Sequence, residues 1–196
     1  MSSRLLLFAH GAGAGSAHPW MRRWAEGLGA LGTVECFDYP YIARGSRRPD
    51  PLPKLVDAHA AALAKAVAAH APEEVVLVGK SMGSRVGCHL ACQSPVDKVV
   101  CFGYPLRTPS GKLRDQVLRA LTTPVLFIQG ARDALCPLEL LDGVRKDMQA
   151  ENELLVVAAG DHSLSVASSE LKRRNLMQSD VDAEILARVT AFVTRR

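Results

Sequence analysis

A serine, an aspartate and a histidine in this 196-residue sequence have the types and the order that nucleophilic catalysis requires. Ser81 occupies the centre of a G-x-S-x-G pattern at residues 79–83. A serine hydroxyl is a poor nucleophile near neutral pH, so it needs a base, and the base needs an acid to orient it. His162 and Asp133 are the candidates for these two roles. The chemistry that such a set performs is attack on an acyl carbonyl.

Residues on both sides of Ser81 predict the turn that a nucleophile of this kind needs. Val75 to Val78 is apolar and mostly β-branched, which predicts a buried strand, and Met82 to Gln93 reads as a helix. A serine between such a strand and helix lies on a sharp turn that exposes its hydroxyl. Glycine is required on both sides of the serine because the neighbouring residues pack against the strand and the helix.

Asp133 and His162 follow the predicted ends of two later strands. The strand Pro124 to Gln129 precedes Asp133, and the strand Glu153 to Ala158 precedes His162. Open parallel sheets build their sites at the carboxyl ends of their strands, so the three side chains are expected to meet there. Asp161 is a weaker candidate for the orienting acid, because an adjacent residue can hardly direct its carboxylate at the Nδ1 atom of its neighbour.

An oxyanion formed during acyl transfer needs two backbone N–H groups. Met82, the residue after the serine, is expected to supply one of them. The glycine-rich loop that begins at His10 is expected to supply the other, from Ala12, and His10 is expected to support this loop rather than to react.

Strand and helix patterns alternate six times along the chain, which predicts one α/β domain over residues 1–196 with a mainly parallel six-stranded sheet in a three-layer α/β/α sandwich. Pro40 to Pro53 carries four prolines and three arginines and is expected to form an irregular loop at the site. The remaining expected strands are 5–9, 33–39 and 98–102, and the remaining expected helices are 19–31, 54–70, 112–121, 137–149 and 179–194.

Four segments together resemble the α/β-hydrolase superfamily, and within it the branch of testis-expressed protein 30 and NSL-complex subunit 3, which is related to dienelactone hydrolases. They read H-G-A-G-x-G, G-K-S-M-G-S-R, Q-G-x-R-D and G-D-H-S and begin at His10, Gly79, Gln129 and Gly160. The resemblance implies a minimal hydrolase fold that lacks the two leading antiparallel strands. Because the connection Gly103 to Gly111 is short, no large cap domain is expected.

Composition narrows the class of protein. The hydrophobic content is 48% and the net charge is +4, and no apolar run approaches the ~20 residues of a membrane span. Five cysteines without a C-x-x-C pattern suggest reduced thiols and a cytoplasmic, or alternatively nuclear, protein. The basic residues lack interleaved aromatics, so no nucleic-acid partner is expected.

Two segments partly match nucleotide-binding motifs, and each lacks a residue that its motif requires. Gly79-Lys80-Ser81 resembles the end of a P-loop, but that motif requires glycine where Glu74 stands. Gly11 and Gly13 resemble the start of a dinucleotide fingerprint whose third glycine is missing. No His, Cys or Asp grouping has zinc-like spacing, so neither a metal nor a cofactor is expected.

The sequence therefore predicts a serine hydrolase for an ester or thioester, with Ser81, Asp133 and His162 as its triad. A catalytically silent interaction module on the same fold is the alternative, with a protein partner. Among enzymes, a peptidase or a dienelactone-type hydrolase also stays open, although the latter typically has a cysteine where Ser81 stands. Lys80 and Arg85 flank the nucleophile and either favour anionic substrates or form structural ion pairs. The acyl group and the oligomeric state are not indicated.

Overall fold

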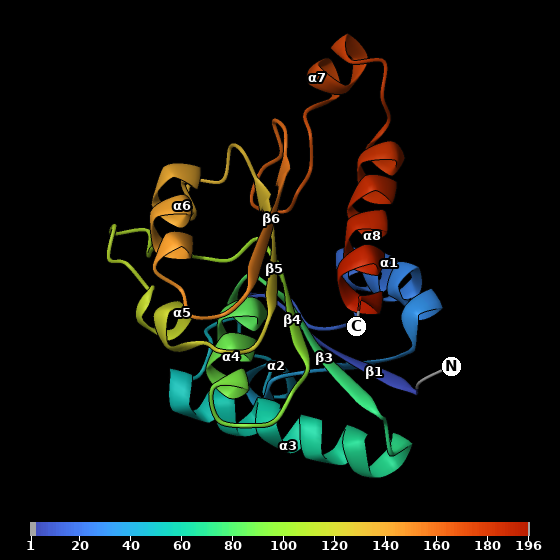
Figure 1. Cartoon of the computed structure of the whole chain (residues 1–196), viewed down its shortest axis with the longest axis vertical. Helices are drawn as coiled ribbons and strands as arrows, with labels where there is room; N and C mark the ends of the chain where they lie inside the picture. The colour runs from blue at the N-terminus through green and yellow to red at the C-terminus, as the bar shows by residue number, and fades with distance from the viewer. Residues whose placement is uncertain (1–2, 196) are drawn as a thin grey trace.

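A computed structural model describes residues 3–195, in which six parallel strands form one twisted sheet (Figure 1). The order across the sheet is β2-β1-β3-β4-β5-β6, and every neighbouring pair is parallel. The chain therefore moves outward from β1 to one edge and then returns past it to build the other side. The strands are β1 (Arg4–Ala9), β2 (Thr33–Phe37), β3 (Glu74–Lys80), β4 (Lys98–Phe102), β5 (Val125–Gly130) and β6 (Asn152–Val157).

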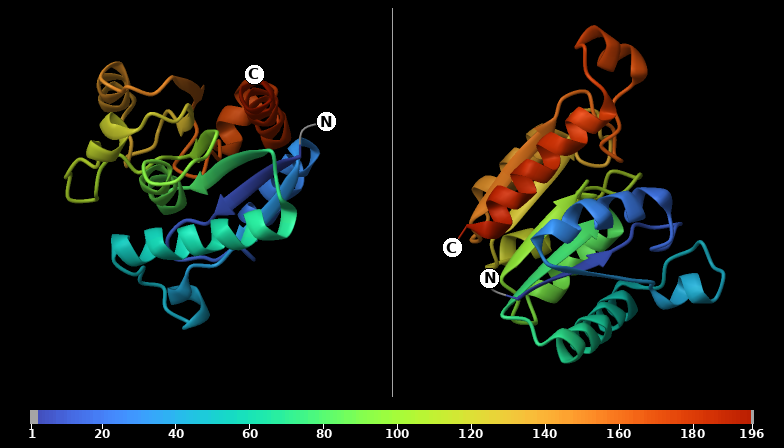
Figure 2. Two further views of the ribbon diagram at one scale, coloured as in Figure 1. Left: turned by 60° about the horizontal axis from the view of Figure 1, so that its bottom comes forward. Right: turned by 90° about the vertical axis from the view of Figure 1, so that its right-hand side faces the viewer.

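Helices cover both faces of the sheet, and the alternation of side chains along β1 shows why. Leu5 and Leu7 point to the face that α3, α4, α5 and α6 cover, whereas Leu6 and Phe8 point to the face that α1 and α8 cover (Figure 2). A strand buried on both faces needs apolar residues at every position, as β1 has. The helices are α1 (Pro19–Leu28), η1 (Gly29–Leu31), α2 (Pro40–Ala43), α3 (Leu52–His70), α4 (Met82–Ala91), α5 (Gln116–Ala120), α6 (Leu138–Lys146), α7 (Ser168–Arg173) and α8 (Gln178–Thr194).

The predicted three-layer architecture with a six-stranded parallel sheet is confirmed, and three local predictions are wrong. The segment from Pro40 to Pro53 is not wholly irregular, because α2 begins at Pro40 and α3 begins at Leu52. Proline fits the first turn of a helix, where its missing N–H has no acceptor to lose. The helix expected from Lys112 begins only at Gln116, since a bridge between Arg107 and Leu113 holds the preceding chain extended. The short polar helix α7 was not predicted.

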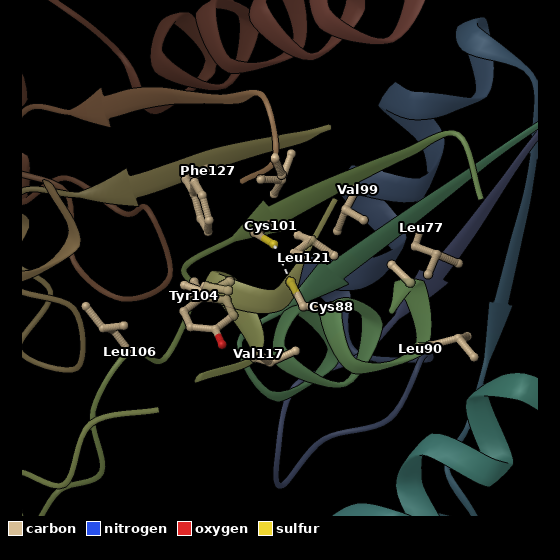
Figure 3. Packing of buried hydrophobic residues seen from close by; sticks show 14 of the residues in the cluster. Leu77, Cys88, Leu90, Val99, Cys101, Tyr104, Leu106, Val117, Leu121 and Phe127 are labelled. Carbon is tan, nitrogen blue, oxygen red and sulfur yellow. Dashed lines mark hydrogen bonds between the residues drawn. The ribbon is translucent and has the colours of Figure 1, made fainter. Parts of the chain in front are cut away.

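The core beneath α4 is tightly filled and holds two of the thiols (Figure 3). Cys88 on α4 and Cys101 on β4 lie with their sulfur atoms 3.8 Å apart, and both side chains are fully buried. The contact with Cys101 and burial raise the pKa of the Cys88 thiol, which keeps Cys88 protonated and unreactive. The helix that carries the nucleophile candidate at its start is thus anchored on the sheet by its apolar face.

None of the helices formed by residues 3–195 is both long enough and apolar enough to span a bilayer.

Candidate active site

Ser81 lies on the sharp turn between β3 and α4, and its backbone is strained. Its φ is +50° and its ψ is −110°, backbone angles that residues other than glycine rarely adopt. The turn is held from both sides, because the Ser81 N–H donates to the carbonyl of Phe102 at 2.9 Å and the Ser81 carbonyl accepts from Arg85 N–H at 3.2 Å. Strain of this kind persists only where the surrounding structure imposes it.

The two glycines of the turn are required by close backbone approach. A side chain at Gly79 would overlap the backbone of Ser84, and a side chain at Gly83 would overlap the carbonyl of Ala9 and lie 2.8 Å from the His10 carbonyl. Helix α4 therefore starts directly against the ends of β1 and β3. This close approach brings the first turn of α4 and the loop after β1 to the same point as Ser81.

The structure brings Ser81, Asp133 and His162 together at the carboxyl ends of β3, β5 and β6. His162 Nε2 lies 2.8 Å from Ser81 Oγ, and His162 Nδ1 lies 2.6 Å from Asp133 Oδ2. The Asp133 side chain is fully buried, while 28% of the His162 side chain is exposed to solvent. The imidazole therefore connects an interior carboxylate to a hydroxyl near the surface.

The surroundings of Asp133 keep its carboxylate ionised. Burial by itself would raise its pKa, but hydrogen bonds from His162, from the Leu135 N–H at 2.8 Å and from the Gln129 amide lower it below the usual value. Gln129 was not singled out in the sequence. Its signal was available, because it is the one polar side chain in the otherwise buried apolar strand β5.

Asp161 has a different partner set from Asp133. Its Oδ1 atom accepts from the N–H groups of Ser163 at 2.7 Å and Ser165 at 2.9 Å. The carboxylate thus closes the turn that carries His162, and it is Asp133 that meets the imidazole.

Lys80, whose role the sequence left open, contacts the loop of His162 rather than an ion-pair partner. Its ammonium donates to the His162 carbonyl and lies 5.3 Å from the ring centre of Trp20. Trp20 in turn donates its indole N–H to the carbonyl of Ser163 at 3.0 Å. Two side chains from β3 and α1 therefore fix two consecutive carbonyls in the loop that carries the imidazole.

We expect the wild-type protein to gain stability relative to Lys80→Met as the pH rises from 7 to 10. Burial lowers the pKa of Lys80 to about 8, against the opposing charges of Asp133 and Asp161, while the unfolded chain keeps the ordinary 10.5. Below pH 8 the folded protein keeps Lys80 protonated, and burying this charge lowers the free energy of unfolding. Between pH 8 and 10.5 the folded protein has released the proton and the unfolded chain has not, so the free energy of unfolding rises with pH.

Urea unfolding at several pH values measures this difference, which is on the order of 2–3 kcal/mol from about 1.4 kcal/mol per pKa unit. Lys65→Met, on the exposed side of α3, is the matched control and should show no such slope. Parallel stability curves for wild type and Lys80→Met would contradict the assignment of a buried ammonium.

A buried histidine fixes the loop after β1. His10 Nε2 accepts from the Tyr39 N–H at 3.1 Å, so its Nδ1 carries the proton and donates to the Gly11 carbonyl at 2.7 Å. Burial lowers the pKa of His10, which favours this neutral form. In a trans peptide the C=O and N–H groups point in opposite directions, so the N–H of Ala12 points away from His10.

The same loop lies against the turn of Ser81. A Cβ atom placed on Gly11 would be 3.5 Å from the Ser81 Cβ atom, which shows how closely the two backbones approach. The Met82 N–H is the first amide of α4, and the first amides of a helix have no acceptor within the helix. Both predicted amide donors therefore belong to segments that border Ser81.

The other histidines have structural partners or lie away from Ser81. His59 is buried with its Nδ1 at 3.2 Å from the Tyr39 hydroxyl, and burial lowers its pKa to about 3. His18 accepts from the N–H of Trp20 at the start of α1, and His70 pairs with Glu35. Within the described part of the chain, no three His, Cys, Asp or Glu side chains are grouped in a way that could hold a metal ion.

The arrangement has the parts that acyl transfer to a hydroxyl needs. A serine hydroxyl contacts the imidazole nitrogen that can remove its proton, and a buried carboxylate contacts the other imidazole nitrogen. Amides at the start of a helix and in a glycine-rich loop border the same point. The two hydrogen bonds that link Ser81, His162 and Asp133 join residues that follow three different strands, so the fold as a whole sets their geometry.

Comparison with known proteins places these features in a wider group. Residues 2–193 match the family model described as alpha/beta hydrolase domain. Among solved structures, a dienelactone hydrolase from Anabaena variabilis superposes with a TM-score of 0.75 at 20% identity, over 97% of this chain and 85% of that one.

Two further structures agree with the first. A metagenome-derived lipolytic enzyme has a TM-score of 0.74 at 16% identity, over 100% of this chain and 96% of the other. A putative alpha/beta hydrolase of unknown function from Agrobacterium tumefaciens has a TM-score of 0.75 at 16% identity, over 99% and 85% of the two chains. At these identities the likeness establishes the fold.

Proposed function

The chain belongs to the α/β hydrolase domain family, and from this premise we propose that it is a serine hydrolase that cleaves an ester or thioester through an acyl-enzyme intermediate. The observation that carries the proposal is the unbroken contact from Ser81 Oγ through the His162 ring to the buried Asp133 carboxylate. Family membership alone permits many functions, because function depends on the site rather than on the fold.

In the proposed first half-reaction, Ser81 Oγ attacks the acyl carbonyl carbon and its proton passes to His162 Nε2. The imidazolium then gives this proton to the departing alcohol or thiol, which leaves the acyl group bonded to Ser81. In the second half-reaction, His162 Nε2 takes a proton from water while the water oxygen attacks the acyl carbon. The imidazolium then returns this proton to Ser81 Oγ as the bond between Oγ and the acyl carbon breaks, which releases the acid and restores the serine. Asp133 holds the proton on Nδ1 throughout and stabilises the imidazolium.

The N–H groups of Ala12 and Met82 are proposed to bind the oxyanion. Two observations support this assignment. The first amides of α4 have no acceptor within the helix, and the hydrogen bond from His10 holds the Gly11 carbonyl toward His10, so the Ala12 N–H of the same peptide points away from it. Donors fixed by the fold before the substrate arrives need no reorganisation during the reaction.

The remaining parts of the proposal follow from the sequence. We infer one domain over residues 1–196, a reaction that uses no cofactor, and a place in the testis-expressed protein 30 and NSL-complex subunit 3 branch. Cytoplasmic location is proposed from the thiol composition, since the cysteines of the described residues are unpaired. The partly exposed imidazole and the connection from β4 to α5, which contains no helix of its own, support an open site that small esters can reach.

We expect the wild-type protein to hydrolyse p-nitrophenyl acetate and to react covalently with a fluorophosphonate probe. Release of nitrophenolate and mass spectrometry of the labelled peptide measure the two outcomes. A silent interaction module would show neither reaction and would instead retain a stable protein partner on purification. Labelling at a residue other than Ser81, or no labelling and no turnover, would contradict the proposed function.

A further inference from the structure

A groove of about 410 Å³ runs beside α4, between that helix, the start of α3 and the chain that leads into α5. Its wall on α4 is formed by Arg85 and His89, and its opposite wall includes Lys112, Arg114 and Asp115. The lining therefore contains three cationic side chains and one acid.

The cations of this groove have no partners of opposite charge. None of the ion pairs that residues 3–195 form includes Arg85, Lys112 or Arg114. The one acid in the lining, Asp115, is already paired with Arg119 at 2.9 Å. The groove thus holds three guanidinium and ammonium groups and no free carboxylate.

Arg85 shows that this arrangement is costly without a ligand. Its Nε atom is buried and has no hydrogen-bond partner in the described chain. Burial lowers the pKa of Arg85, an effect that the Tyr104 phenol opposes and that the positive charge of Arg114 increases. A desolvated cation beside a second cation is unfavourable unless an anion compensates it.

A second cavity shows the contrast. About 1050 Å³ in volume, it lies at the amino ends of the strands and is lined by Arg4, Glu74 and Lys98 among others. There the charges neutralise one another, because Glu74 accepts from Arg4 at 2.7 Å and from Lys98 at 3.2 Å. Unpaired positive charge is a property of the groove beside α4.

The groove begins one helical turn from the nucleophile candidate. Arg85 and His89 lie one turn apart on the same side of α4, and the Arg85 N–H donates to the Ser81 carbonyl at 3.2 Å. Arg85 therefore follows the nucleophile candidate by one helical turn, about 6 Å along the axis. An acyl chain attached to Ser81 would have to span about one helical turn to bring its far end to Arg85.

We propose that this groove binds an anionic group, a carboxylate or a phosphate, that the substrate carries at a short distance from its reacting carbonyl. The proposal rests on the proposed function, because it defines the substrate class of the same site. The anion would supply the opposite charge that the Arg85 and Arg114 side chains lack.

Two probe esters that differ in one charge test this proposal. They are mono-p-nitrophenyl glutarate, whose acyl chain ends in a carboxylate, and its methyl ester, which is neutral. We expect kcat/KM for the charged ester to fall about tenfold in Arg85→Gln and about three- to tenfold in Arg114→Gln, since one charge-assisted contact is lost. The neutral ester should change less than about twofold in both variants.

Arg22→Gln is the matched control, because Arg22 is exposed on α1 and belongs to none of the ion pairs of the described residues. It should leave the ratio of the two kcat/KM values unchanged. Arg114 reaches the groove from a loop, so its variant tests the proposal even if Arg85→Gln lowers the thermal midpoint. An unchanged ratio in both groove variants would overturn the anion site while leaving the hydrolase in place.

A binding measurement separates this proposal from the proposed function. Glutarate and inorganic phosphate are titrated calorimetrically into Ser81→Ala protein, which does not depend on turnover. Weaker binding in Ser81→Ala/Arg85→Gln supports the site, and the preferred probe distinguishes carboxylate from phosphate. Absence of binding by both probes would overturn the site. If these probes bind but the wild-type protein hydrolyses neither ester, the proposed hydrolase function would be overturned and the anion site would stand.

Discussion

Ser81→Ala is expected to lower kcat/KM for p-nitrophenyl acetate by roughly 10⁴- to 10⁶-fold, the range found when a serine nucleophile is removed from a complete triad. Without Oγ no acyl-enzyme forms, and only the background supplied by binding and by the oxyanion amides remains. The variant should also lose fluorophosphonate labelling entirely. Steady-state kinetics and intact-protein mass spectrometry measure both effects.

Ser81→Gly provides the control for the strained turn. Both variants lack the nucleophile and should be equally inactive, but alanine keeps the cost of a φ of +50° and glycine does not. The glycine variant should therefore be more stable than the alanine variant by about 1 kcal/mol in urea unfolding. Hydrolysis by Ser81→Ala at more than about one hundredth of the wild-type rate would exclude Ser81 as the nucleophile.

Asp133→Asn is expected to lower kcat by roughly 10³- to 10⁴-fold with little change in KM, because the histidine tautomer changes. The Leu135 N–H donates to Oδ1 and keeps an oxygen at that position, so the new NH₂ group replaces Oδ2. It would then face both the His162 Nδ1 atom and the Gln129 NH₂ group. The imidazole relieves the conflict by moving its proton to Nε2, where it can no longer accept from Ser81.

Asp161→Asn is the matched control for this substitution. An asparagine oxygen still accepts from the Ser163 and Ser165 amides, so the His162 turn keeps its shape. We expect activity within about threefold of wild type. Equal losses in the two variants would show that neither carboxylate orients the imidazole specifically.

Much of this fold was predictable because local and global signals agree. Strands β1, β3, β4 and β5 are continuous apolar runs, and each is followed by a segment with helical spacing. The prediction failed where prolines start helices rather than interrupt them, at Pro40 and Pro53, and where a bridge between Arg107 and Leu113 delays α5. These outcomes depend on contacts that no short window of sequence contains.

For the candidate site, residue types in the sequence identified the three side chains, but not the residues whose contacts hold them in place. Ser81, Asp133 and His162 stand in recognisable positions after strands, and chain order relates them. The contacts of Lys80 and Trp20 with the His162 loop join residues more than 80 positions apart, and they follow only from the sheet order. The cationic groove likewise combines the second turn of α4 with a loop whose course the sequence does not indicate.

The order of strands in the sheet also governs when during folding the site can exist. The first strand, β1, is enclosed by β2 and β3, and the histidine and aspartate belong to the far side that β5 and β6 complete. Parallel pairings between distant segments form slowly, because the entropy of closing long loops is lost before the contacts are gained. A nascent chain that already carries Ser81 therefore holds an unactivated alcohol until its last strand has docked. If the proposed function holds, recovery of hydrolysis during refolding is expected to report completion of the whole sheet rather than formation of the Ser81 turn alone.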